Sequence, residues 1–220
     1  MPVVRFLDEL DPQARAVFDA LGTRRRFDAG ATMFMEGDRS GSVLAILAGR
    51  VKVYATSADG QDFVLAVRGP GEVLGDFSAI DDAPRSASGV ALEPVEVRVI
   101  PARAFRDFLF DTPGAGLALL TTMVDRMRDS DRLRVGLGAR DTLGRVSLRL
   151  FELVEECGVQ EDGSTRIDMP LTQDDLAGWV AASREAVARA LASLRKRGII
   201  TTARREIRVL DVEQLREAAR

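Results

Sequence analysis

The chain has no histidine among its 220 residues and only one cysteine, Cys157. Without histidine it lacks the commonest general base, the usual zinc and haem ligand, and the base of a Ser-His or Cys-His pair. One thiol can neither close a disulfide within the chain nor hold an iron–sulfur cluster. We therefore expect no catalytic residues, no metal ligands and no covalent cofactor, and we expect the reducing cytoplasm as the location.

Long apolar runs are also missing, because charged residues interrupt every such stretch, so no membrane-spanning segment is expected. The first residues lack a long apolar core followed by a small-residue cleavage site, which argues against a signal peptide. With 46% hydrophobic and 30% charged residues, the composition is that of a soluble globular protein with one large or two small domains.

The first half of the chain has the pattern of β-strands. A short amphipathic helix is expected at 8–21, and from Phe27 to Pro101 short alternating apolar runs are separated by glycine and aspartate turns. The runs occupy 43–47, 51–54, 63–67 and 95–100. This spacing predicts a small all-β barrel or roll.

Helical periodicity replaces the strand pattern after Pro101. A short helix is expected at 105–110, and a long one from Gly114 to about Leu137. The long helix carries an apolar seam whose partner is the β-roll, a second copy of the chain, or both; its residues are Leu117, Leu120, Val124 and Met127. Two glycines at 136–139 suit a hinge. The expected domains are 1–112, a dimerisation helix at 113–139, and 140–220.

In the last domain, a helix is expected at 141–157 and a polar turn at 158–164. The net charge of the chain is −3, but residues 184–208 contain eight basic and two acidic side chains. Such a local basic patch suits a module that meets phosphates. Charge alone, however, favours an ordinary solvated helix face.

The segment 171–198 adds a stronger signal. Thr172, with Asp175 three residues later, caps one helix, a tight turn follows at Ala181-Ala182, and Ser183 caps the next helix. Gly198 ends this second helix, and two short strands with arginines at their tip follow it. The pattern predicts a winged helix-turn-helix, although an ordinary helical hairpin with charged exposed positions would share part of it.

The second helix of the motif would enter the DNA major groove. An arginine fork matches the two acceptors of guanine, and a carboxylate accepts from cytosine. Arginines at the tip of the wing would bind phosphates and set register. The expected DNA-binding residues are Thr172, Ser183, Arg184, Glu185, Arg189, Arg204 and Arg205.

The densest motif of the β part is GEVLGDFSAIDDAPRSAS, residues 71–88. Gly75 permits a tight backbone whose neighbours offer amides, while Arg85 supplies a cationic fork and Ser86 a hydroxyl. Together they would form an anion pocket matched to a phosphate. An acidic residue beside it, Asp76, suits a sugar hydroxyl. A surface loop with one arginine is the plain alternative.

With these motifs, the chain resembles the cyclic-AMP receptor/Fnr family of bacterial transcription regulators. The resemblance covers almost the whole chain and rests on LAGRVKVY (47–54), GDFSAIDDAPRSAS (75–88), the long helix and SREAVAR (183–189). It implies an α+β fold with an N-terminal cyclic-nucleotide-binding β-roll, a long dimerisation helix and a C-terminal winged helix-turn-helix.

The resemblance also implies an effector site. Gly75, Arg85 and Ser86 match the phosphate-binding cassette, whereas Asp76 replaces a glutamate that binds the ribose. On the long helix, Ser130 and Asp131 stand where a Thr-Ser pair binds the base, and Asp131 departs from that pair. The expected effector-binding residues are Gly75, Asp76, Phe77, Ser78, Arg85, Ser86, Ser130 and Asp131. These departures leave the effector open between cyclic AMP, another cyclic nucleotide, cyclic di-GMP and none.

The expected function is that of a homodimeric, sequence-specific DNA-binding regulator controlled by a small effector. The resemblance implies a palindromic operator with TGTGA-like half-sites, and RNA polymerase as a partner of an activator. Two other classes stay open: a nucleotide-binding regulatory subunit that does not bind DNA, and an enzyme on a small β-barrel, which the missing histidines disfavour.

Overall fold

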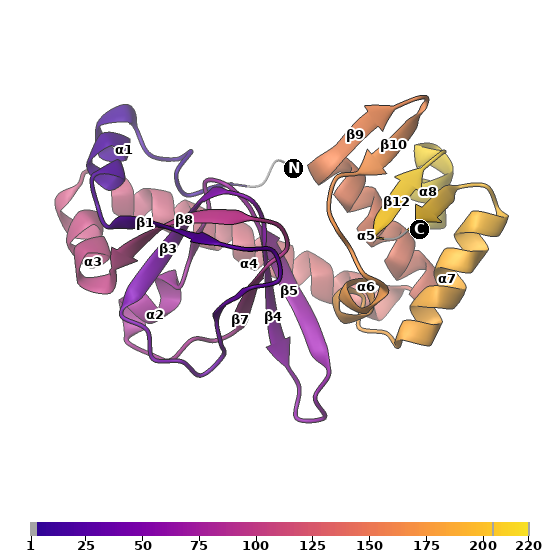
Figure 1. The fold of residues 1–220 in the computed structure, drawn as a ribbon, viewed down its shortest axis with the longest axis horizontal. Coiled ribbons are helices and arrows are strands. Elements are labelled where there is room, and N and C mark those ends of the chain that lie inside the picture. Colours follow the sequence, from indigo (N-terminus) through magenta and orange to yellow (C-terminus); the bar gives the residue numbers. More distant parts are fainter. Residues whose placement is uncertain (1–3, 204, 220) are drawn as a thin grey trace. The chain divides into compact units, whose positions relative to one another are not determined.

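The computed structural model describes residues 4–203 and 205–219, and the chain divides into two compact units (Figure 1). One unit consists of Met1–Ala55 with Val64–Asp129, and the other of Thr56–Phe63 with Ser130–Arg220. Among the described residues, no helix combines the length and the apolar character needed to cross a membrane.

Two antiparallel four-stranded sheets form the first half of the chain, with strand orders β1-β8-β3-β6 and β2-β7-β4-β5. This confirms the β-roll expected from the alternating runs. The strands are β1 (Thr23–Phe27), β2 (Thr32–Phe34), β3 (Ser42–Ala48), β4 (Val51–Thr56), β5 (Asp62–Arg68), β6 (Val73–Leu74), β7 (Ser88–Ala91) and β8 (Val95–Pro101). The helices of this half are α1 (Pro12–Asp19), α2 (Asp76–Asp81), α3 (Ala102–Asp111) and the long α4 (Ala115–Ala139).

Apolar and charged side chains alternate along the first part of β8, so that one face of the strand packs in the core of the roll. Val95 and Val97 are buried in the core, whereas Glu96 and Arg98 point to the other face of the sheet. A second part of the core lies between the helices and the roll, where the rings of Phe6 and Phe18 meet edge to face with centroids 5.7 Å apart.

The first helix is shorter than the amphipathic pattern at 8–21 indicates. It begins at Pro12, because the Asp11 carboxylate accepts from the Ala14 amide at 2.8 Å and proline suits the first helical position. The residue before a proline is disfavoured in the helical region, and Asp11 accordingly has an extended backbone, so the helix does not continue towards the N-terminus.

The second half contains a helical core and a third four-stranded sheet, in the order β11-β12-β10-β9. Its elements are α5 (Thr142–Cys157), β9 (Gly158–Glu161), β10 (Ser164–Ile167), α6 (Gln173–Trp179), α7 (Arg184–Lys196), β11 (Ile200–Ala203), β12 (Glu206–Val209) and α8 (Val212–Ala218). The expected helix-turn-helix is α6 and α7, and the expected wing is β11 and β12.

The segment 158–164, expected as a polar turn, contains β9 and the start of β10, and the turn itself is Asp162-Gly163, where both residues have positive φ. An Asp-Gly pair suits this tight hairpin, and β12 provides the neighbouring strand that stabilises it. The segment 136–139, expected as a hinge, is part of helix α4 in this structure.

Candidate functional site

The segment 75–88, called the cassette from here on, begins with a turn at Gly75 between β6 and α2. This residue has φ of +79° and precedes the first residue of α2. A side chain there would be strained, and its Cβ would overlap the Nη1 atom of Arg85. Gly75 is therefore required both by the left-handed backbone and by the guanidinium packed against it.

Arg85 is buried, with 4% of its surface exposed. Its Nη2 donates to the Ser40 hydroxyl at 2.8 Å and to the Ser42 carbonyl oxygen at 2.7 Å, and the guanidinium lies over the Phe34 ring. Its Nε and Nη1 atoms are buried without a hydrogen-bond partner. Arg85 thus has two donors that the surrounding protein leaves unsatisfied.

The charge of Arg85 is only partly balanced. Burial lowers the pKa of its guanidinium, while the carboxylates of Asp76 and Asp38 act in the opposite direction. Since a buried cation is costly without a close counter-ion, this side chain would be stabilised by an anion placed beside it.

Asp76 is buried at the start of α2, where Arg126 of α4 donates from Nη1 to its carboxylate at 2.8 Å. The Nη2 atom of Arg126 also donates to the Val73 carbonyl oxygen at 2.9 Å. Burial lowers the pKa of Arg126, and Asp76 is the strongest influence against that shift. The cassette is therefore tied directly to the long helix.

Arg126 is not among the residues expected from the sequence. The sequence offers one indication of its role. Arg126 lies on the side of α4 that also carries the buried Thr122 and Asp125, opposite the exposed apolar seam. Helical spacing alone does not show that a charged side chain at such a position turns inward.

The other expected effector residues have different surroundings. Ser78 is buried in α2, whereas Phe77 is half exposed and Ser86 is exposed. Ser130 and Asp131 occupy exposed positions of α4, beyond Asp129, where the first unit ends. The structure thus brings together Gly75, Asp76 and Arg85, with Arg126 added.

The second unit confirms the caps of the helix-turn-helix. Thr172 accepts from the Asp175 amide at 3.0 Å, and the Asp175 carboxylate accepts from the Thr172 amide at 3.0 Å, which completes a capping box. Ser183 caps α7 by accepting from the Ala186 amide at 3.2 Å. The turn between the helices has Ala181 in the left-handed region, at φ of +47°.

Helix α7 separates an apolar from a polar face. Its buried side is made by Val187, Ala190, Leu191 and Leu194. The expected base-reading residues Arg184, Glu185 and Arg189 are all exposed. This face is therefore available to a partner. Trp179 of the supporting helix α6 is buried.

Glu185 lies at the positive end of α7. Hydrogen bonds from its own backbone amide and from the Ser183 hydroxyl, together with the charges of Arg189 and Arg184, hold the pKa of its carboxyl below the ordinary value. The carboxylate therefore stays ionised at neutral pH and can accept a hydrogen bond. Arg184 Nε lies 3.6 Å from the Asp174 carboxylate in an exposed pair.

Beside this face lies a hollow of about 350 Å³ between the start of α5 and the side of α7 that faces it. Its walls are formed by Asp141, Thr142, Leu143, Ala186, Arg189, Ala190 and Ser193. The small residues of α7 leave room here, and Arg189 supplies positive charge at the edge.

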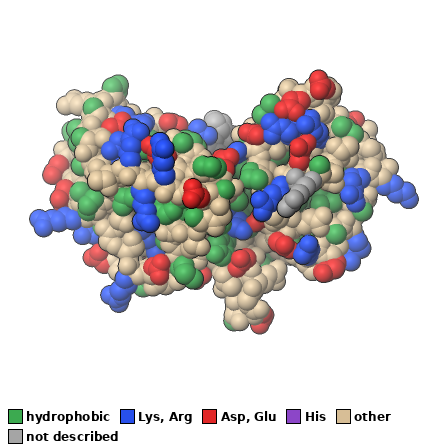
Figure 2. Space-filling model, viewed as in Figure 1, with side chains coloured by type: hydrophobic (Ala, Val, Ile, Leu, Met, Phe, Trp, Pro, Cys, Tyr) green, Lys and Arg blue, Asp and Glu red, His purple; other side chains and the backbone are tan. Residues whose placement is uncertain are grey.

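The wing carries Arg205 in its turn, with φ of +58°, whereas Arg204 lies outside the described residues. Not every arginine of the basic segment 184–208 is free of acidic partners and so able to bind phosphate. Arg208 donates to Glu206 at 2.6 Å and to Glu161 at 2.9 Å, and Glu161 also binds Arg166. Figure 2 shows basic and acidic side chains gathered over β9 and β10, where this network lies.

Comparison with known families gives two matches along the chain. Residues 24–112 match the cyclic nucleotide-binding domain, and residues 144–218 match the Crp-like helix-turn-helix domain. The first region contains the cassette and Arg85, and the second contains α6, α7 and the wing.

Characterised relatives extend over most of the chain. A CRP-like cAMP-activated global transcriptional regulator of Mycobacterium tuberculosis is 32% identical over 194 residues, which cover 88% of this chain and 87% of the relative. The cyclic AMP receptor protein of Thermus thermophilus is 28% identical over 199 residues, covering 89% and 88%.

Solved structures support the same fold. The c-di-GMP-responsive global regulator CLP of Xanthomonas campestris matches 90% of this chain and 99% of its own, with a TM-score of 0.81 at 24% identity. FixK2 of Bradyrhizobium japonicum matches 91% and 98%, with a TM-score of 0.76 at 20% identity. The chain therefore belongs to the Crp/Fnr family, as a DNA-binding transcription regulator with an N-terminal cyclic nucleotide-binding domain.

Proposed function

We propose that the protein is a homodimeric regulator whose affinity for DNA rises when a cyclic nucleotide, cyclic AMP in the first instance, binds at the cassette. The observation that carries the proposal is Arg85, a buried guanidinium with two unsatisfied donors against the backbone of Gly75. A similar protein of Mycobacterium tuberculosis is described as cAMP-activated, and one of Xanthomonas campestris as c-di-GMP-responsive.

The cyclic phosphate would accept from Nε and Nη1 of Arg85. A charge-assisted pair of hydrogen bonds contributes more than a neutral pair, and the negative charge would counteract the effect of burial, which lowers the pKa of Arg85. Ser86, exposed on the next position, would add its hydroxyl, and the backbone around Phe77 and Ser78 would surround the phosphate.

The ribose hydroxyl would donate to Asp76. That carboxylate already accepts from Arg126 of α4, so ligand binding at Asp76 would act on the ion pair that joins the cassette to the long helix. Ser130 and Asp131, farther along α4, are our candidates for contacts to the base.

DNA would be read by α7. Arg184 and Arg189 would donate to guanine and Glu185 would accept from cytosine, in TGTGA-like half-sites. Arg204 and Arg205 of the wing, with the capped helix starts at Thr172 and Ser183, would contact phosphates.

Dimerisation would use the apolar seam of α4. Leu117, Leu120, Val124 and Met127 follow a spacing of three and four, and they are 39% to 69% exposed. This is the pattern of a helix that packs against a second copy. Two copies would present their α7 helices to successive major grooves about 34 Å apart on a palindromic operator.

We place this activity in the cytoplasm, with RNA polymerase as the partner in activation.

The effector is tested by measuring operator affinity with cyclic AMP, cyclic GMP or cyclic di-GMP present. We expect cyclic AMP to raise the affinity of the full-length protein by about 5- to 150-fold, the usual range of allosteric coupling. Arg85→Gln should abolish the response, because it removes the charge facing the phosphate. Arg103→Ala, which changes an exposed arginine of α3, should keep it.

A response to cyclic di-GMP alone would assign that effector in place of cyclic AMP. An affinity that no nucleotide changes would contradict effector control. A full response in Arg85→Gln would contradict the cassette as the binding site.

The DNA contacts are tested with a panel of operators that differ at one base pair each. Glu185→Ala should relax the preference at one position by about 1–3 kcal/mol, because it removes a base contact. Arg205→Ala should weaken all operators about equally and lower the salt dependence, because a phosphate contact is the same for every sequence. Identical profiles for the two variants would contradict the assignment.

A further inference from the structure

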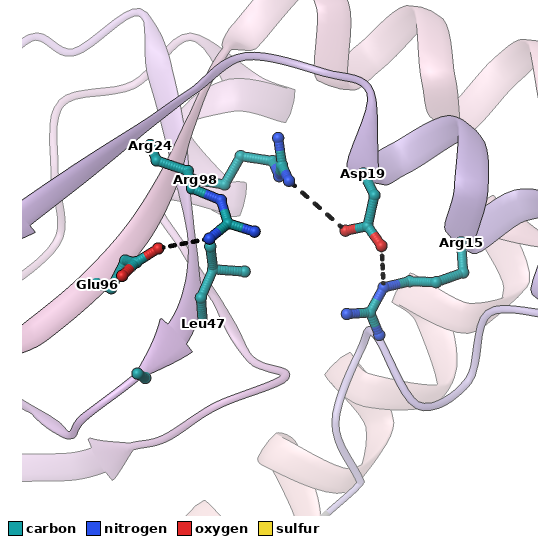
Figure 3. A pocket seen from close by; sticks show the side chains of 7 residues that line it. Arg15, Asp19, Arg24, Leu47, Glu96 and Arg98 are labelled. Carbon is teal, nitrogen blue, oxygen red and sulfur yellow. Dashed lines mark hydrogen bonds and ion pairs between the residues drawn. The ribbon is translucent and has the colours of Figure 1, made fainter.

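The first unit contains a second hollow, formed by none of the cassette residues. It has a volume of about 440 Å³ and lies where α1 meets β1, β3 and β8 (Figure 3). Its walls are formed by Arg15, Asp19, Arg24, Leu47, Ala48, Glu96 and Arg98. A volume of this order is that of a pocket for a small molecule and exceeds the need of a single water or ion.

The strand register concentrates positive charge at this hollow. Arg24 of β1 lies directly opposite Arg98 of β8, and Arg26 lies opposite Glu96. Glu96 is shared, since it accepts from Arg24 Nη1 at 2.9 Å and from Arg26 Nε at 3.2 Å. Like charges directly across a strand pair destabilise a sheet, so this placement is unfavourable without a further anion.

Arg98 is the least satisfied of these cations. Its side chain is 11% exposed, and its Nη1 donates to the Leu21 carbonyl oxygen at 3.1 Å. The nearest carboxylate of the hollow, Asp19, lies 4.0 Å from Nη2 and already accepts from Arg15 Nε at 3.0 Å. The Nε atom of Arg98 is buried without a hydrogen-bond partner, which is costly unless an acceptor is supplied.

The balance of charge is positive. Among the residues that line the hollow, the guanidiniums of Arg15, Arg24 and Arg98 outnumber the two carboxylates of Asp19 and Glu96, so the lining carries a net charge of +1. Arg26, which is not part of the lining, adds a further positive charge through its ion pair with Glu96. Figure 3 shows Asp19 between Arg15 and Arg98, with the Arg24 and Arg98 side chains close together on the other side. Leu47 adds an apolar wall next to these charges.

We propose that this hollow binds a small organic dianion, a phosphorylated or polycarboxylate metabolite, as a second ligand of the protein. Two neighbouring guanidinium forks match the paired oxygens of a phosphate or carboxylate, and the anion would accept from Arg24 and Arg98 at once. Its negative charge would balance the net positive charge of the lining. Because none of these residues belongs to the cassette, the ligand would bind independently of the cyclic nucleotide.

The test is isothermal titration of the full-length protein with citrate, glucose 6-phosphate and inorganic phosphate, without cyclic nucleotide. We expect saturable binding of citrate or glucose 6-phosphate, and the one that binds tighter identifies the carboxylate or the phosphate class. Arg24→Ala and Arg98→Gln should each weaken it at least about tenfold, as loss of a charge-assisted bond predicts. Glu96→Gln should tighten it, because it removes a competing negative charge.

The controls separate this site from others. Arg103→Ala changes another exposed, ion-paired arginine of the same unit that lies outside the hollow, so this variant should bind the dianion normally. Arg85→Gln should also bind it normally, whereas loss of binding there with normal binding in Arg24→Ala would place the anion at the cassette and overturn the proposal.

Absence of saturable binding by both organic anions would overturn the proposal too. Arg24 is 67% exposed, so its replacement leaves the fold intact even where replacement of the buried Arg98 does not. The test then depends on dianion affinity, which should fall in Arg24→Ala and rise in Glu96→Gln. Equal affinities in these two variants would contradict the proposal.

Discussion

At the scale of single residues, the cassette joins a backbone requirement to an electrostatic one. Gly75 adopts a left-handed conformation, and the Arg85 guanidinium occupies the space that a side chain would need. Neither residue can change without affecting the other, because the unsatisfied Nη1 donor of Arg85 lies directly against the turn at Gly75.

We therefore expect Gly75→Ala to destabilise the protein by about 1–2 kcal/mol from backbone strain and, in addition, to displace Arg85 and abolish cyclic nucleotide binding. Urea unfolding and calorimetric titration with cyclic AMP measure the two effects. The matched control is Gly30→Ala, because Gly30 also has a positive φ, of +82°, but its Cβ would meet no atom within 4 Å.

Gly30→Ala should lower the free energy of unfolding by a similar amount but leave the affinity for cyclic AMP unchanged. If both variants bind the nucleotide equally well, the space at Gly75 is not needed for the effector site.

Residue types in a motif were predictable, but their partners were not. Arg85, Asp76 and Gly75 stand out in the sequence because a glycine, a carboxylate and an arginine lie within eleven residues. Arg126 is fifty residues from Asp76, and only the fold brings its guanidinium to 2.8 Å from that carboxylate. The same holds for Arg24 and Arg98, which become neighbours through strand register.

At the scale of elements, local signals determine the helix-turn-helix well. The capping box at Thr172 and the cap at Ser183 involve residues at most three positions apart, so the sequence shows them directly. The hairpin of β9 and β10 was missed because its strands have four residues each and depend on β12, which lies forty residues later. Pairing over such a distance leaves little local pattern.

The turn between α6 and α7 provides a test at this scale. Ala181 has φ of +47°, which costs an alanine about 1–2 kcal/mol that glycine avoids. Ala181→Gly also increases the entropy of the unfolded chain by about 0.4–1 kcal/mol, so we expect a small net stabilisation of about 0.5 kcal/mol. Chemical denaturation measures it.

The control is the next residue, Ala182, which lies outside the left-handed region. Ala182→Gly has only the entropic cost and should destabilise by about 0.5–1 kcal/mol. Equal destabilisation by both substitutions would show that the turn is not strained at Ala181.

At the scale of the whole molecule, the proposed regulation requires two copies. Helix α4 has an inner side, on which Arg126 pairs with Asp76 of the cassette, and an outer seam of exposed apolar residues. One helix thus connects the cassette, where we propose that the effector binds, with the surface that would pair the subunits, and a palindromic operator needs both α7 helices at a fixed separation. A monomer would bind one half-site and lose the contribution of the other.

Leu120→Asp tests this organisation, because Leu120 is 62% exposed at the centre of the seam and a charge there would be buried against its counterpart. We expect sedimentation to show a monomer and affinity for a palindromic operator to fall at least about tenfold, while affinity for a single half-site stays the same. The control is Val17→Asp, a 44% exposed apolar residue of α1, which should leave a dimer with full affinity. A dimeric Leu120→Asp would assign subunit pairing to another surface, and a monomeric variant that binds the palindrome normally would show that one copy is sufficient for DNA recognition.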